Sequence, residues 1–98
     1  MTGGFVLTPR AQRDLDEIWD YTSDRWGLHQ AETYTRQLWT DIEAVAANPA
    51  MGRPCAEVRA GYHKHPSGSH VLFYRIIPDG IDVVRILHED MDHERHLP

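Results

Sequence analysis

The sequence predicts an α+β domain in which a helical hairpin packs on one face of a small, mainly antiparallel sheet. The first half of the chain holds two largely apolar stripes with helical spacing, separated by a glycine. The second half holds three β-prone runs joined by short turns. With a further β-prone run at the start, the element order is β-α-α-β-β-β, and we expect a single domain over residues 1–98.

The first strand and the first helix are separated by a helix-start signal. Residues 4–8, GFVLT, are β-prone, and Thr8-Pro9 places a capping hydroxyl before a proline at the first helical position. Gly27 is typical of a helix C-terminus. The stripe expected to face the core contains Ala11, Leu15, Ile18, Trp19, Thr22 and Trp26. The residues expected on the other surface include Arg10, Asp14, Asp16, Glu17 and Asp20.

A second helix is predicted to follow at once and to end near Asn48. Its end is set by Pro49, which disfavours helical geometry in the residue before it. Because only the turn at Gly27 separates the two helices, they most simply form an antiparallel hairpin. The stripe of the second helix contains Ala31, Tyr34, Leu38, Ile42 and Val45, with Trp39 on its flank.

Three strands are predicted in the second half, at residues 56–65, 69–77 and 81–88. Pro66-Ser67-Gly68 and Pro78-Asp79-Gly80 supply turn residues between them. Such short connections require antiparallel neighbours, since a parallel pair needs a long crossover.

Both faces of the last two predicted strands are rather apolar. Strict alternation places Val83, Arg85 and Leu87 on one face and Val84 and Ile86 on the other. The helical hairpin covers one face, and no further element of the chain is left to cover the second. We therefore expect an exposed apolar groove with embedded arginines, a feature that often marks a partner site.

Composition narrows the classes of function. The net charge is −5, whereas proteins that grip phosphate backbones are usually basic, so we expect no sequence-specific contact with nucleic acid. The single cysteine, Cys55, excludes an internal disulfide and multi-cysteine metal motifs, which fits a reducing, cytoplasmic location. No apolar run approaches the roughly 20 residues of a membrane span, so no membrane contact is expected.

Residues 88–96, HEDMDHERH, are rich in metal-binding and acid–base residue types. A zinc-protease helix needs two histidines four apart, but Asp92 stands where the second histidine after His88 should be. His93 and His96 share a helical spacing, yet two ligands make a weak site. We expect no metal and no other cofactor, and a short helical or irregular tail that packs Leu97 against the body.

Another candidate for chemistry is the thiol of Cys55, with His63 and His65 on one side of a predicted strand. A lone thiol is far more often inert than catalytic, and the two histidines are as readily explained by a polar strand edge.

Several stretches together resemble a known family. In order, the chain contains FVLTPRAQRDLDEIWDYTSDRWGLHQAETY, NPAMGRPC, GYHKHPSGSHVLFYRI and DVVRILHEDMD-ER-L. This succession resembles the ParE toxins of type II toxin–antitoxin systems, within the wider RelE/ParE superfamily, over about residues 5–97. Its most specific parts are Tyr21 to Gly27 and Arg85 to His88 leading into Met91-Asp92. The resemblance implies the same β-α-α-β-β-β fold.

The resemblance also implies a binding function without catalytic residues. The usual target of the family is DNA gyrase, which the toxin is thought to trap in the cleaved-DNA state. A ParD-type antitoxin would neutralise the toxin in a hetero-oligomer, its acidic C-terminal segment lying along the helices and in the groove beside the sheet. The implied antitoxin-binding residues are Trp19, Trp26, Arg59, Phe73, Arg75, Arg85 and His88.

The alternative is a ribosome-dependent mRNA endonuclease of the RelE type. Such enzymes use a general base, cationic groups at the scissile phosphate and a general acid. Arg75 and His88 stand at positions resembling those used in that branch and are its candidate catalytic residues. Against it, Glu89 stands where some members carry a tyrosine, and a net charge of −5 opposes entry into a ribosomal site.

Overall fold

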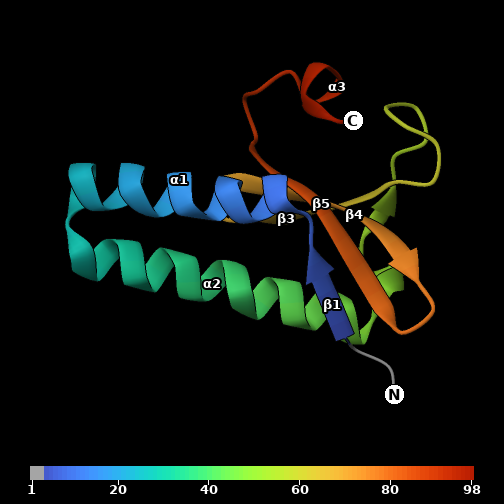
Figure 1. The fold of residues 1–98 in the computed structure, drawn as a ribbon, viewed down its shortest axis with the longest axis horizontal. Coiled ribbons are helices and arrows are strands. Elements are labelled where there is room, and N and C mark those ends of the chain that lie inside the picture. Colours follow the sequence, from blue (N-terminus) through green and yellow to red (C-terminus); the bar gives the residue numbers. More distant parts are fainter. Residues whose placement is uncertain (1–3) are drawn as a thin grey trace.

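The computed structural model describes residues 4–98 and has the predicted element order with short additions. Figure 1 shows the helical hairpin on one side of the sheet and the C-terminal segment at its other side. The main elements are β1 (Gly4–Leu7), α1 (Pro9–Trp26), α2 (Leu28–Ala47), β3 (His63–Ser67), β4 (His70–Ile77) and β5 (Gly80–His88). The additions are a 3₁₀ turn, η1 (Pro49–Met51), the two-residue strand β2 (Arg53–Pro54) and the one-turn helix α3 (His93–His96).

The five strands form one sheet in the order β1-β5-β4-β3-β2. The pairs β3–β4 and β4–β5 are antiparallel, as their short connections predicted, and the additional strand β2 also pairs antiparallel with β3. β1 pairs with β5 in parallel, and the helical hairpin lies between these two strands in the chain. The α+β fold class is therefore confirmed, with a mixed sheet that is mainly antiparallel.

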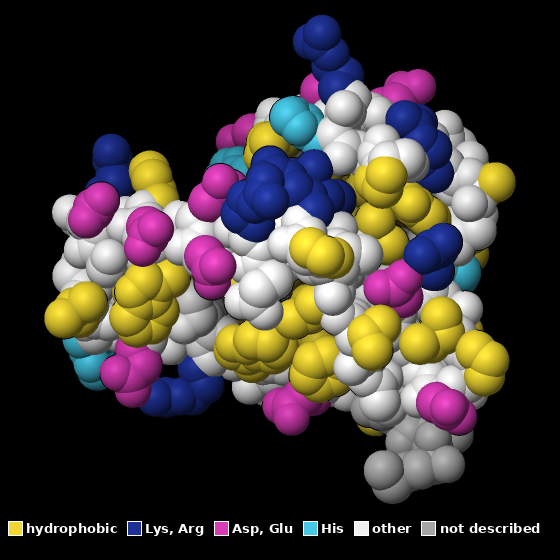
Figure 2. All heavy atoms as spheres, in the orientation of Figure 1, with side chains coloured by type: hydrophobic (Ala, Val, Ile, Leu, Met, Phe, Trp, Pro, Cys, Tyr) yellow, Lys and Arg dark blue, Asp and Glu magenta, His cyan; other side chains and the backbone are white. Residues whose placement is uncertain are grey.

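The hairpin begins and turns where the sequence indicated. The hydroxyl oxygen of Thr8 accepts a hydrogen bond from the amide of Ala11 at 3.0 Å, which caps α1. Gly27 separates α1 from α2 with a φ of 94°, in the region that favours glycine. The two helices lie side by side and extend beyond the sheet (Figure 1). Figure 2 shows hydrophobic side chains along the seam between them.

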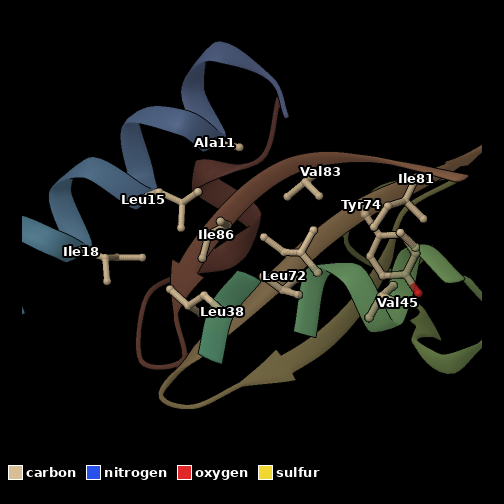
Figure 3. Close-up of a cluster of buried hydrophobic side chains, with 12 residues drawn as sticks. Ala11, Leu15, Ile18, Leu38, Val45, Leu72, Tyr74, Ile81, Val83 and Ile86 are labelled. Carbon is tan, nitrogen blue, oxygen red and sulfur yellow. The ribbon is translucent and has the colours of Figure 1, made fainter. Parts of the chain in front are cut away.

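The main core lies between the hairpin and the facing side of the sheet. α1 contributes Leu15 and Ile18, and α2 contributes Leu38 and Val45, all of them buried. In Figure 3 these side chains point toward those of β4 and β5. The strand residues of this core are Leu72, Tyr74, Ile81, Val83 and Ile86.

The opposite face of the sheet is covered by the chain itself, so the predicted exposed apolar face is wrong. A second buried cluster joins Phe73 of β4 to Val84 and Leu87 of β5. Its cover comes from the turns of residues 55–62 and from Leu97, of which only 4% is exposed. The physical reason is that irregular segments bury apolar side chains as well as helices do, without a periodic pattern in the sequence. The predicted packing of Leu97 is confirmed.

The first strand predicted in the second half begins too early. Only His63–Ser67 is extended and paired, whereas residues 56–62 form turns. The amide of Val58 donates to the carbonyl of Cys55 at 2.9 Å, and the amide of Cys55 donates to the carbonyl of Tyr62 at 2.8 Å, which closes a compact loop. Gly61 has a φ of 81° there, a conformation that interrupts a strand.

Candidate functional site

A groove of about 300 Å³ runs between α1 and the C-terminal half of β5, and we call it the α1–β5 groove. The apolar residues that line it include Ile18, Tyr21 and Met91. Its other lining residues are Arg10, Asp14, Glu17, Thr22, His70, Arg85, Ile86, Leu87, His88 and His96.

The groove exists because β1 is shorter than β5. β1 pairs with β5 only from Gly80 to Val83, so the rest of β5 has no strand on that side. α1 supplies replacement partners, because the Thr8 hydroxyl donates to the carbonyl of Val84 at 2.8 Å and Asp14 accepts from the amide of Ile86 at 2.9 Å. Side chains therefore close part of this strand edge, and the α1–β5 groove lies beside them.

A buried ion pair holds α1 against β5 at the side of the groove. Arg85 donates from Nε to Asp14 Oδ2 at 2.8 Å and from a terminal nitrogen to Oδ1 at 3.0 Å. Its other terminal nitrogen donates to the carbonyl of His96 at 2.7 Å. Only 4% of Asp14 and 6% of Arg85 are exposed. The placement of Asp14 on the outer surface of its helix is therefore wrong: the carboxylate is buried, and Arg85 and the amide of Ile86 supply the hydrogen-bond partners that a buried charge needs.

A bulge in β5 explains the position of Arg85. Phe73 pairs with Arg85 and Tyr74 pairs with Val83, so Val84 has no partner on β4. One extra residue reverses the alternation of all side chains beyond it. Val83 and Ile86 consequently share the main core, while Val84 and Leu87 share the second cluster. The facial grouping expected from strict alternation is wrong for this reason.

Tyr34, His70 and His88 form a polar cluster at the other side of the groove. The Ser69 amide donates to the Tyr34 hydroxyl oxygen at 2.9 Å, and that hydroxyl lies 2.6 Å from His70 Nδ1. The tautomer of His70 decides which of these two atoms is the donor. The rings of His70 and His88 meet edge to face, 5.3 Å apart. Burial, together with the nearby His88, lowers the pKa of His70 to about 4, so its imidazole is neutral at pH 7.

This lowered pKa predicts an acid-sensitive fold. In the unfolded chain His70 has its ordinary pKa of 6.5, so the unfolded state takes up a proton first as the pH falls. The stabilisation is complete above pH 6.5 and is lost as the pH falls from there toward about 4. Near pH 4.5 we expect a loss of about 1–2 kcal/mol, since one pKa unit corresponds to about 1.4 kcal/mol and the ring is partly exposed.

Urea unfolding between pH 7 and pH 4.5 measures this effect. The variant His70→Gln removes the titrating ring and should show a flatter dependence on pH than the wild type. Equal slopes for the two proteins would assign the acid sensitivity to other groups. The titratable groups around His70 are Tyr34, which is hydrogen-bonded to Nδ1, His88, which lowers the pKa of His70, and Asp14, which raises it.

An aromatic end lies beside the polar cluster, toward the tip of the hairpin. A hollow there is lined by Tyr21, Trp26, Tyr34 and the two histidines of the cluster. Tyr21 is 62% and Trp26 is 68% exposed, large fractions for side chains of this size. The guanidinium of Arg25 lies 5.8 Å from the centre of the Tyr21 ring. The α1–β5 groove is thus continued by aromatic surface that contacts solvent.

The structure brings three of the predicted antitoxin-binding residues to this region. Arg85 and His88 line the α1–β5 groove, and Trp26 lines the adjoining hollow. The guanidinium of Arg85 forms an ion pair with the carboxylate of Asp14, however, so Arg85 is not the unpaired cation in an open groove that we expected. Trp19 lies elsewhere, in a shallow hollow with Trp39 at the seam between the helices.

The other three predicted residues lie away from the groove. Arg59 donates to the backbone carbonyls of Glu94 and Leu97 and so holds the C-terminal segment. Phe73 has no exposed surface and packs edge to face against His93. Arg75 is exposed and pairs with Asp82 at 2.7 Å. As the chain stands in this structure, Phe73 offers no surface to a partner.

The two candidate ribonuclease residues do not form one site. His70 of β4 pairs with His88 of β5, and Arg75 of β4 pairs with Asp82 of β5. His88 therefore lies beside His70, which is five residues along β4 from Arg75. At about 3.3 Å per residue, Arg75 and His88 are separated by roughly 16 Å. A single scissile phosphate does not reach both side chains. The catalytic pair expected for the ribonuclease alternative is therefore not assembled in the structure.

The remaining chemical candidates also stay apart. Cys55 is fully buried, and burial raises the pKa of its thiol, which opposes formation of a reactive thiolate. His63 stacks on Tyr74 within the sheet. Within residues 4–98, no group of three or more histidine, cysteine, aspartate or glutamate side chains is placed to hold a metal ion. None of the helices in that range is long and apolar enough to cross a bilayer.

Comparison with known proteins decides the family. The model of the ParE toxins of type II toxin–antitoxin systems, parDE, matches residues 5–93. This chain is a member of the ParE toxin family. Toxin ParE1 of Mycobacterium tuberculosis (strain H37Rv) is 54% identical to it, over 99% of this chain and 100% of the relative. Toxin ParE1 of Caulobacter vibrioides is 46% identical, over 95% of this chain and 96% of the relative.

Solved structures support the ParE fold. A chain of the chromosomal ParDE system from Pseudomonas aeruginosa superposes with a TM-score of 0.77 at 21% identity, covering 89% of this chain and 96% of its own. A chain of the RelBE2 toxin–antitoxin complex from Mycobacterium tuberculosis superposes with a TM-score of 0.63 at 20% identity, covering 90% and 99%. At these identities the similarity shows the fold alone.

Several residues of the groove in this ParE toxin escaped the sequence reasoning. Asp14 carried a usable signal, because it follows Ala11 by three residues and precedes Ile18 by four, and so lies on the buried stripe of α1. Met91 belonged to the family resemblance, but no local pattern placed it or His70 in the groove. His70 reaches the groove through the pairing of β4 with β5, and Met91 reaches it through the path of the C-terminal segment.

Proposed function

We propose that the chain inhibits DNA gyrase and is neutralised by a ParD-type antitoxin. The observation that carries the proposal is the match to the ParE toxin family over residues 5–93, together with relatives named Toxin ParE1 that align along nearly their whole length. DNA gyrase is the usual target of that family. The described residues also favour action by binding, since they form a largely apolar groove and the candidate catalytic pair is split.

The antitoxin is proposed to occupy the α1–β5 groove. The groove combines apolar walls with a strand edge that α1 completes only in part, and an amphipathic or extended peptide segment uses both features. The solved relatives of the same fold are described as a ParDE system, the RelBE2 complex and the YoeB–YefM complex of Staphylococcus aureus. Of the predicted contact residues, Trp26, Arg85 and His88 adjoin this route, while Trp19, Arg59, Phe73 and Arg75 lie off it.

A paired assay tests the choice of target. The purified chain is added to DNA supercoiling by gyrase and, separately, to translating ribosomes on a defined mRNA. We expect supercoiling to stop with accumulation of cleaved DNA, and the mRNA to remain intact. Cleavage of ribosome-bound mRNA with gyrase unaffected would overturn the proposal and favour the RelE-type alternative. The variant Arg75→Ala sharpens the comparison, because Arg75 is the candidate catalytic arginine of the RelE-type alternative: loss of mRNA cleavage in this variant would support that alternative.

A further inference from the structure

A second hollow, which we call the arginine hollow, lies at the N-terminal end of α1. Arg10 and Arg13 of α1 and Arg95 of α3 line it, and among residues 4–98 its lining contains no aspartate or glutamate. In the same range, none of these three arginines forms an ion pair. Figure 2 shows Lys and Arg side chains gathered over this end of α1. Although the net charge of the chain is −5, these arginines form a local positive surface that no aspartate or glutamate side chain of the described residues neutralises.

The arginine hollow is continuous with the α1–β5 groove. Arg10, Arg85 and His96 line both of them, so one surface leads from the apolar walls at Ile18 and Met91 to the free arginines. Arg85 contributes no free charge because Asp14 neutralises it. A segment lying in the groove thus meets apolar side chains first and unpaired positive charges at the end where α1 begins.

We propose that the arginine hollow binds carboxylate side chains of the same antitoxin segment whose apolar side chains fill the α1–β5 groove. This inference rests on the proposed function. Guanidinium groups pair with carboxylates through two parallel hydrogen bonds, and three unpaired arginines at one place favour a cluster of acids over a single one. The arginine hollow thereby fixes the direction in which the segment lies.

The length of α1 sets the spacing within that segment. Ile18 and Arg10 are eight residues apart on a helix that rises about 1.5 Å per residue, which gives roughly 12 Å between them. An extended peptide covers that distance in about four residues. The partner should therefore carry its acids about four residues beyond its apolar anchor.

A nucleic-acid backbone fits this surface less well. Glu17 of α1 lines the groove itself, whereas Asp16 lies at the seam between the helices. Phosphates laid along the groove would approach the carboxylate of Glu17 at close range, and the apolar walls offer them no partner. A peptide that places apolar side chains there brings no negative charge to Glu17.

Binding titrations with charge-reversed variants test the inference. Arg13→Glu and Arg95→Glu are compared with the wild type and with Arg53→Glu, an exposed arginine on β2 at the opposite edge of the sheet. The probes are a purified ParD-type antitoxin and a short DNA duplex, each at low and at high salt. We expect Arg13→Glu and Arg95→Glu, the two variants of the arginine hollow, to bind the antitoxin about ten- to a hundred-fold more weakly than Arg53→Glu does. Their affinity should also depend less on the salt concentration.

The outcomes separate this inference from the proposed function. A wild type that binds the antitoxin, with hollow variants that match Arg53→Glu, overturns the inference and leaves the proposed function standing. A wild type that binds no antitoxin overturns both. Binding of the DNA duplex that depends on Arg13, with unchanged affinity for the antitoxin, assigns the hollow to nucleic acid instead. Circular dichroism of each variant confirms that the exchanged side chain has not unfolded the chain.

Discussion

Replacing Asp14 with alanine should lower the free energy of unfolding by about 3–5 kcal/mol, because it leaves the buried guanidinium of Arg85 without its carboxylate. The same carboxylate also accepts from the amide of Ile86, which would become an unpaired buried donor. Urea unfolding of Asp14→Ala measures the loss. It should persist at high salt, since ions in solution screen a buried pair only weakly.

Two further variants distinguish the loss of the ion pair from a general effect of changing a residue of α1 on stability. Asp16→Ala removes an exposed carboxylate of the same helix, whose side-chain partner is Gln12, and should cost less than about 1 kcal/mol. The double variant Asp14→Leu/Arg85→Met replaces the pair with apolar side chains and should recover part of the loss. If Asp14→Ala were no less stable than Asp16→Ala, the pair would not hold α1 against β5.

Replacing Leu97 with alanine should loosen the cover of the second cluster. Leu97 is buried against Phe73, Val84 and Leu87, and truncation of a buried leucine costs about 2–5 kcal/mol. Because Leu97 lies next to the end of the described chain, part of that cost can be avoided by local release of residues 93–98. We expect a loss near 2 kcal/mol, together with exposure of the face that the segment covers.

The thiol of Cys55 reports that release directly. Cys55 belongs to the same cluster and is fully buried, so a thiol reagent should modify it slowly in the wild type and at least several-fold faster in Leu97→Ala. Val6→Ala is a suitable control, because it removes a side chain of β1 that is 54% exposed. Unchanged thiol reactivity and unchanged stability in Leu97→Ala would show that the C-terminal segment does not cover this face.

Sequence patterns predicted the elements because their signals are local. The cap at Thr8, the turn at Gly27 and the stop before Pro49 each act within a few residues, and the structure confirms the helices they delimit. The turn before β5 is confirmed at Pro78-Asp79, whereas the turn before β4 lies later than predicted, at Gly68-Ser69, because Pro66 and Ser67 still pair with β4. The resemblance to ParE toxins rested on a succession of such stretches, and the family match confirms it.

The site was less predictable because it depends on contacts between distant residues. The bulge at Val84 reverses the faces of β5, yet the sequence contains no glycine or other mark of it. The pair Asp14–Arg85 joins residues 71 positions apart. The cover of the second face comes from turns and a tail, whose apolar residues have no periodicity. These three features replace the expected open sheet face with a groove at the edge of β5.

Supercoiling by purified DNA gyrase, followed while this chain and then a ParD-type antitoxin are added, tests the central claim most directly. Supercoiling should stop when the chain is added, cleaved DNA should accumulate, and activity should return as the antitoxin reaches an equal amount. Gyrase that works at its full rate in saturating amounts of the folded chain would contradict the account. So would an inhibited gyrase that the antitoxin fails to release.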